Sequence, residues 1–299
     1  MATQATTQEI SEDETLEKAA ASIKAFARAK GAPLVGIASV EAINKYAPPG
    51  AQPADILPEV QRVIVVGVES SPGGAWHTPD PRFMGVVSNN RLSQAKSIAD
   101  QIAEFVETEF GYYAMPYATY ALASGGWDPI LSFKVCAEVA GIGSRSLAGG
   151  MILNKDHGFP YIGICMTSMP LPTDNPVDED VCPHSSCVKM WETYGTTPCI
   201  STCPMCLSGS IDESGKIESW AYDRHRCAPR ANYTRPRLLL MLQEVMSESD
   251  PDRRRMLIHG PEFSHHISAV ANSTEISGQC FECIRVCPVD RKRRLKQRS

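Results

Sequence analysis

Long apolar runs are missing from this 299-residue chain: none approaches the roughly 20 residues that a membrane span requires. The first residues, MATQATTQEISEDE, also lack the apolar segment of an export signal, so we expect a cytoplasmic protein without a membrane partner. A strong charge of one sign is missing too. The net charge of −5 is mild, so we do not expect a nucleic-acid partner.

Nucleotide-binding motifs are also missing. The glycine-rich segments SGG (124–126), GIGS (141–144) and AGG (148–150) contain neither a GxGxxG between a strand and a helix nor a P-loop with its lysine. A nicotinamide or nucleotide cofactor is therefore not expected. Glycines in these segments indicate tight turns, or places where backbone approaches a bulky ligand.

The first part of the chain alternates helix and strand patterns. Apolar residues repeat at helical spacing over 16–27, 91–110 and 131–141. The run RVIVVGVE (62–69) is apolar at almost every position, which predicts a central strand covered on both faces. The alternation indicates an α/β layered domain. The other expected strands are 33–40, 112–122, GMILN and YIGICMTS.

The composition changes near residue 175, after the proline-rich segment MPLPTDNP. We expect a flexible N-terminus over 1–13, the α/β domain over 14–175, a cysteine domain over 176–290 and a basic tail over 291–299. The cysteine domain has one clear helical pattern, PRLLLMLQEVMSE (236–248). Because it has so little apolar periodicity, we expect bound metal to supply part of its folding free energy.

Cysteines are plentiful, and without an export signal they are not expected to form disulfides. Two of the eleven, Cys136 and Cys165, precede residue 180. The other nine crowd the last part of the chain, which predicts a metal-binding domain. They are Cys182, Cys187, Cys199, Cys203, Cys206, Cys227, Cys280, Cys283 and Cys287.

Zinc and iron–sulfur clusters are the two metal chemistries that compete for these thiols. Zinc would take four thiolates from the pairs Cys203/Cys206 and Cys280/Cys283, and this leaves the others without a role. The C-x3-C-P pattern, however, occurs twice, at 199–204 and 283–288. In two-cluster ferredoxins the cysteine before such a proline binds the other cluster. Eight ligands are then needed and nine are present, which favours two [4Fe-4S] clusters.

The crossed pattern predicts which thiols hold each cluster. Cys206 is then spare, although Cys182 and Cys206 could exchange roles because the first motif is spread out. The first cluster would use Cys182, Cys187, Cys199 and Cys287, and the second would use Cys203, Cys227, Cys280 and Cys283.

Several segments occur in the order LPEVQRVIVVGVES, AEVAGIGS, YIGICMTSMPLPTDNP, the double cysteine motif and CFECIRVCPV. This order resembles the epoxyqueuosine reductase and reductive dehalogenase superfamily over about 34–290. The resemblance implies an α/β (α+β) fold: a nitroreductase-like domain that binds cobalamin, followed by a ferredoxin-like domain with two [4Fe-4S] clusters.

The resemblance also implies site residues in the first domain. Asp128 is the candidate proton donor, because a carboxyl near Trp127 and a cofactor would have its pKa raised toward useful values. Tyr113 and Tyr117 are alternative donors, and Arg145 is the nearest cation after the AGIG segment. The glycines expected to admit the corrin are Gly141, Gly143, Gly149, Gly150 and Gly163.

The function expected from the sequence is a cobamide-dependent iron–sulfur reductase. Electrons would pass from a ferredoxin or flavodoxin through both clusters to cobalt and on to a small organic substrate. Two alternatives stay open: an electron-transfer or corrinoid-reducing protein without its own substrate, and epoxyqueuosine reductase itself.

Overall fold

The computed structural model describes residues 12–71, 73, 81–117, 131–203, 205–223, 226, 238–261, 263 and 282–289. The chain divides into two compact units, and each is described by itself. The first unit comprises Met1–Glu69, Gln94–Arg145 and Ile152–Val181, and the second comprises Ser70–Ser93, Ser146–Met151 and Cys182–Ser299.

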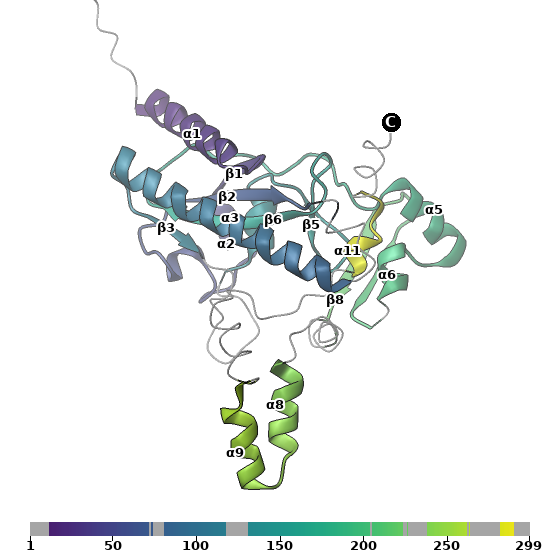
Figure 1. Cartoon of the computed structure of the whole chain (residues 1–299). Helices are drawn as coiled ribbons and strands as arrows, with labels where there is room; N and C mark the ends of the chain where they lie inside the picture. The colour runs from purple at the N-terminus through teal and green to yellow at the C-terminus, as the bar shows by residue number, and fades with distance from the viewer. Residues whose placement is uncertain are drawn as a thin grey trace, which may run out of the picture. The chain divides into compact units, whose positions relative to one another are not determined.

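A four-stranded antiparallel sheet forms the centre of the first unit (Figure 1). Its order is β1 (Leu34–Ser39), β2 (Arg62–Glu69), β6 (Pro160–Thr167) and β3 (Ala114–Tyr117). Strand β2 lies between two neighbours and its six central residues are buried, so the expectation of a central strand covered on both faces is confirmed.

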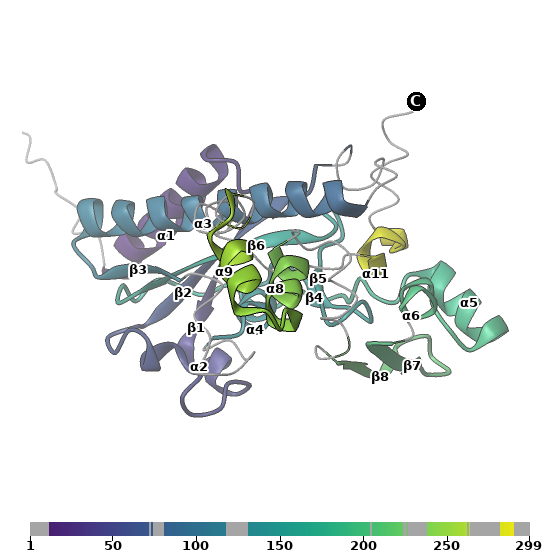
Figure 2. The same ribbon diagram turned by 60° about the horizontal axis from the view of Figure 1, so that its bottom comes forward.

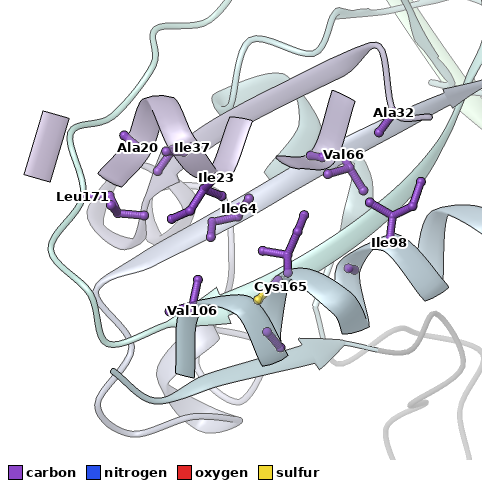
Figure 3. Close-up of a cluster of buried hydrophobic side chains, with 14 of the residues drawn as sticks. Ala20, Ile23, Ala32, Ile37, Ile64, Val66, Ile98, Val106, Cys165 and Leu171 are labelled. Atoms are coloured by element: carbon purple, nitrogen blue, oxygen red, sulfur yellow. The ribbon is translucent and has the colours of Figure 1, made fainter. Parts of the chain in front are cut away.

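Helices α1 (Glu12–Ala29) and α3 (Pro81–Phe110) contribute to the apolar cluster on one face of this sheet (Figure 3). Ala19, Ile23 and Ala27 recur at helical spacing and are almost fully buried. Phe26 stacks on Phe105, with ring centroids 4.5 Å apart. Helix α3 begins ten residues before the helix expected at 91–110.

The opposite face of the sheet carries a second apolar cluster, formed with α2 (Val40–Asn44) and α4 (Phe133–Val139). The Ser132 hydroxyl caps α4 by accepting a hydrogen bond from the Val135 N–H. The small hairpin of β4 (Ser144–Arg145) and β5 (Ile152–Leu153) and the 3-10 turn η1 (Pro53–Asp55) complete the elements of this unit. The expected α/β layered fold is therefore confirmed.

The second unit has more regular structure than its sequence suggested, so the expectation of one clear helix was wrong. It contains α5 (Ser185–Tyr194), α6 (Pro198–Thr202), α8 (Leu238–Ser247), α9 (Pro251–His259), α11 (Glu282–Arg285) and the hairpin of β7 (Leu207–Ile211) and β8 (Ile217–Tyr222) (Figure 2).

Local capping explains why these helices form without long apolar patterns. Helix α5 begins at His184, whose ring nitrogen accepts a hydrogen bond from the Ser186 N–H, and ends at Gly195 with φ +63°. The Asp250 carboxylate caps α9 in the same way, and α9 contains no buried residue. Across the described residues, no helix is long and apolar enough to cross a membrane.

Candidate metal centre

A cavity in the second unit gathers cysteines from distant parts of the chain. It encloses about 330 Å³, part of which is open to solvent. Four of the residues around it are thiols: Cys182, Cys187, Cys199 and Cys287. These are the four cysteines that the crossed pattern assigned to one cluster. The other lining residues include Leu147, Ala148, Pro198, Pro288 and Val289, so much of the wall is apolar.

Short elements carry these cysteines to the cavity. Cys187 lies in the first turn of α5, Cys199 lies in α6 and Cys287 follows α11. Helix α11 contacts α6, as Figures 1 and 2 show, which brings the C-terminal cysteine to the earlier ones. Cys182 lies in the segment that leads into α5. The packing of α11 on α6 therefore brings together cysteines that are far apart in the sequence.

The thiols of the cavity are poorly solvated. Burial, together with the neighbouring Cys199, raises the pKa of Cys187 to about 11. Burial also raises the pKa of Cys199, while a hydrogen bond from Thr197 opposes that shift. Thiols with such pKa values are neutral near pH 7, so a bound metal must displace their protons.

Hydrogen bonds reach at least three of the four sulfurs, those of Cys182, Cys187 and Cys199. The Leu147 N–H donates to Cys182 Sγ at 3.4 Å. Thr197 Oγ1 lies 3.2 Å from Cys199 Sγ, and both residues are buried. Such donors stabilise negative charge on a sulfur that is bound to a metal.

A single zinc ion and a cubane require different arrangements of thiols. Among the described residues, no three Cys, His, Asp or Glu side chains are close enough together to share one metal ion. A zinc ion would draw four thiolates to about 2.3 Å from one point. A cubane instead takes each thiolate at a separate iron, so its ligands surround a volume, as the four cysteines surround this cavity.

The cysteines expected around the second cluster are described only in part. Cys203 and Cys206 are both buried, and their sulfurs lie 2.9 Å apart. Cys283 is half-buried in α11. Cys227 and Cys280 lie outside the described residues. Cys182 lines the cavity and Cys206 does not. This supports Cys182, rather than Cys206, as the ligand of the first cluster, a choice that the sequence spacing left open.

Protein atoms occupy the space beside the glycines expected to admit a corrin. A Cβ at Gly141, Gly143 or Gly163 would meet a backbone carbonyl oxygen within 2.4 Å. Gly149 and Gly150 have positive φ and face the rings of β8, with Trp220 2.9 Å from a Cβ at Gly150. Close packing or positive φ therefore gives each of these positions a reason for glycine that does not depend on a cofactor.

The candidate proton donors differ in their surroundings. Asp128 lies outside the described residues. Tyr117 is 4% exposed, its hydroxyl accepts a hydrogen bond from the Leu131 N–H, and burial raises its pKa. Tyr113 is 67% exposed. Arg145 forms an ion pair with Glu138, with Nε and Oε2 2.7 Å apart.

Two polar pairs in the first unit escaped the sequence analysis. The Asp174 carboxylate accepts from the Ile37 N–H at 2.8 Å and pairs with Lys24 at 2.7 Å, so this residue of the PLPTD segment joins β1 to α1. Glu69, the last residue of β2, pairs with the His157 ring. In both pairs the partners are far apart in the sequence and meet only in the folded protein, so no sequence spacing would have revealed them.

Comparison with known proteins supports the resemblance seen in the sequence. No family model matches the chain. The epoxyqueuosine reductase of Salmonella typhimurium is 29% identical over 186 residues, which is 55% of this chain and 45% of that protein. The chain therefore spans about half the length of the curated relative that it matches.

Solved structures share the fold. An epoxyqueuosine reductase solved with a tRNA stem loop superposes with a TM-score of 0.51 at 16% identity, over 92% of this chain and 66% of that one. A catabolic reductive dehalogenase gives a TM-score of 0.53 at 19% identity, over 91% of this chain and 38% of that one. Solved structures from both groups that the sequence resembles thus share the fold of this chain, and the resemblance is confirmed.

Proposed function

We propose that the chain is an iron–sulfur reductase that carries two [4Fe-4S] clusters and delivers their electrons to an organic substrate. One observation carries the proposal: Cys182, Cys187, Cys199 and Cys287 line a single cavity of the second unit. The sequence similarity to epoxyqueuosine reductase supports the reductase activity.

The residues of the second unit would hold the clusters. The four thiols of the cavity would bind the first cluster, and Cys203, Cys227, Cys280 and Cys283 would bind the second. Each cluster supplies one-electron redox chemistry when bound. The wall of the cavity includes the apolar residues Leu147 and Val289, and apolar surroundings influence the reduction potential of a cluster.

An epoxide in a modified tRNA nucleoside is the substrate that the comparisons support best. The similarity in sequence is to an epoxyqueuosine reductase, and one structural neighbour was solved with a tRNA stem loop. Nucleic acid, not expected from the charge of the chain, therefore enters as a proposed partner. Removing an epoxide oxygen as water takes two electrons and two protons. A ferredoxin or flavodoxin would supply the electrons one at a time.

Cobalamin enters only as the cofactor that the resemblance implies. Protein atoms lie on the Cβ side of the five glycines expected around it, so these positions do not support the group, and we assign it no step. We keep three residues as candidates that act on the substrate: Asp128 and Tyr113 as proton donors, and Arg145 as a cation. Tyr117 is a weaker one, because its hydroxyl is buried and already accepts a hydrogen bond.

Anaerobic purification followed by iron and sulfide analysis tests the clusters. We expect close to eight irons for each chain, on the basis of two cubanes, and an electron paramagnetic resonance (EPR) signal after reduction with dithionite. One zinc and no iron would overturn the proposal.

The substrate is tested separately on the iron-loaded protein. A stem-loop RNA that carries epoxyqueuosine and a brominated phenol are each incubated with reduced donor protein, and products are read by mass spectrometry. Loss of one oxygen from the RNA supports the proposed substrate. Release of bromide alone would favour the small organic substrate that the sequence suggested.

A further inference from the structure

Thr197 is a fully buried threonine beside a cysteine of the cavity. Its exposed fraction is 0%, and its Oγ1 lies 3.2 Å from Cys199 Sγ. Within the described part of the chain, that sulfur is the one hydrogen-bonding partner found for the hydroxyl. The hydroxyl therefore depends on this sulfur for its hydrogen bond.

The usual reason for a threonine at this position is absent. Thr197 is the N-cap residue of α6, where a hydroxyl commonly accepts a hydrogen bond from the first turn of the helix. Here the side chain makes no such bond. Burying a hydroxyl is unfavourable unless it is hydrogen-bonded, and valine would fill the same space without that penalty. The contact with sulfur is what compensates the buried hydroxyl.

Metal binding determines the direction of this hydrogen bond. A free Cys199 thiol could donate or accept, but a thiolate bound to iron carries no proton. The Thr197 hydroxyl must then donate. Because both residues are buried, water does not compete for the proton.

We infer that Thr197 is a positioning residue that donates a hydrogen bond to Cys199 and raises the reduction potential of the cluster held in this cavity. The inference rests on the proposed function. Reduction adds one electron from the donor and breaks no bond, and part of the added charge resides on the cysteine sulfurs. A donor aimed at one sulfur stabilises the reduced cluster more than the oxidised one.

The loop over the cavity contributes a second donor of the same kind. The Leu147 N–H donates to Cys182 Sγ. Its loop is packed against β8, where Trp220 faces Gly150 and Tyr222 faces Gly149. A side-chain substitution cannot remove a backbone donor. Of these two donors, Thr197 is therefore the one that mutation can remove.

A redox titration of Thr197→Val tests the inference. The anaerobic protein is titrated with dithionite while the EPR signal of each cluster is recorded. At a fixed potential near the midpoint, we expect the reduced-to-oxidised ratio of one cluster to fall about tenfold, which is about 59 mV for a one-electron couple. The other cluster should keep its potential.

Thr196→Val is the matched control. Thr196 is the neighbouring threonine, and its hydroxyl contacts Ser201 Oγ at 3.1 Å instead of a thiol. This variant should titrate as the unchanged protein does. Thr197→Ser, which keeps the hydroxyl, should restore most of the potential.

Unchanged potentials in a fully iron-loaded Thr197→Val would overturn the inference. If that variant fails to take up iron, Thr197→Ala and Thr197→Ser replace it, because they differ by one oxygen atom. Equal potentials in that pair would also overturn the inference. If the unchanged protein binds no iron, the proposed function fails first and the inference falls with it.

Discussion

Buried cysteines occur in both units of this protein, but they serve different ends. Cys136 and Cys165 are fully buried in the two apolar clusters on either face of the sheet of the first unit, where they pack as small apolar side chains. Figure 3 shows Cys165 within one of these clusters. Cys187, Cys199 and Cys287 are almost as buried, at 6–8% exposed, yet they surround a cavity. Burial alone therefore does not distinguish the two kinds of cysteine, and it is their convergence on one space that makes the second set candidate metal ligands.

The two units also differ in what stabilises them. The first buries long apolar runs of β2 and β6 between helices. The second consists of short helices and a hairpin, and α9 buries no residue. We therefore expect the first unit to be stable by its own core and the second to depend on its bound metal.

Removing the clusters should produce the largest difference between the units. Extraction of iron with a chelator under reducing conditions should unfold the second unit, because metal binding supplies part of its folding free energy. The first unit should keep its protection. Hydrogen exchange followed by mass spectrometry reads both units in one sample. Equal loss of protection in β2 and α5 would contradict this division.

Substitution of one cavity cysteine should remove one cluster. Cys287→Ala should lower the iron content by about half, because the cubane in the cavity would lose a ligand while the other keeps all four. Cys206→Ala is the control and should retain its iron. Iron analysis under anaerobic conditions measures both. Full iron in Cys287→Ala, or half in Cys206→Ala, would show that the two ligand sets are assigned wrongly.

Gly163→Ala should destabilise the first unit whether or not a cofactor is bound. Its new Cβ would lie 2.2 Å from the Ala95 carbonyl oxygen, so α3 or β6 must shift. We expect a loss of about 1–3 kcal/mol in the free energy of unfolding, measured by urea denaturation without cobalamin. Gly50→Ala is a control for the glycine exchange, since nothing lies within 4 Å of that position, although its φ of +83° adds some strain. A stable Gly163→Ala that binds no cobalamin would instead favour a role for this glycine at the corrin.

The smallest expected effect is a loss of stability of the first unit at alkaline pH. Burial raises the pKa of Cys136 from 9.0 to about 12. The unfolded chain therefore releases this proton first, and stability falls as pH rises above 9. The loss should reach about 1.4 kcal/mol at pH 10. Denaturation of Cys136→Ala between pH 8 and 10 should show a shallower slope, and an equal slope would contradict the assigned cause.

Local patterns predicted much of the first unit, for physical reasons. Strand β2 and helix α4 follow from apolar runs and spacing that suit only one kind of element. Tyr113 and Tyr117 show where this reasoning stops. Strand alternation placed them on one face, but one is 67% and the other 4% exposed, because coverage depends on what other segments pack there.

The sequence by itself determined that nine cysteines follow residue 180 and that the C-x3-C-P pattern occurs twice, which is enough to count ligands for two clusters. The tertiary structure decided which four thiols share a cavity, and it placed Thr197 and Leu147 against two of them. Spacing restricts only neighbours along the chain. The meeting of Cys287 with Cys199 depends on the packing of α11 against α6, which involves residues far apart in the sequence.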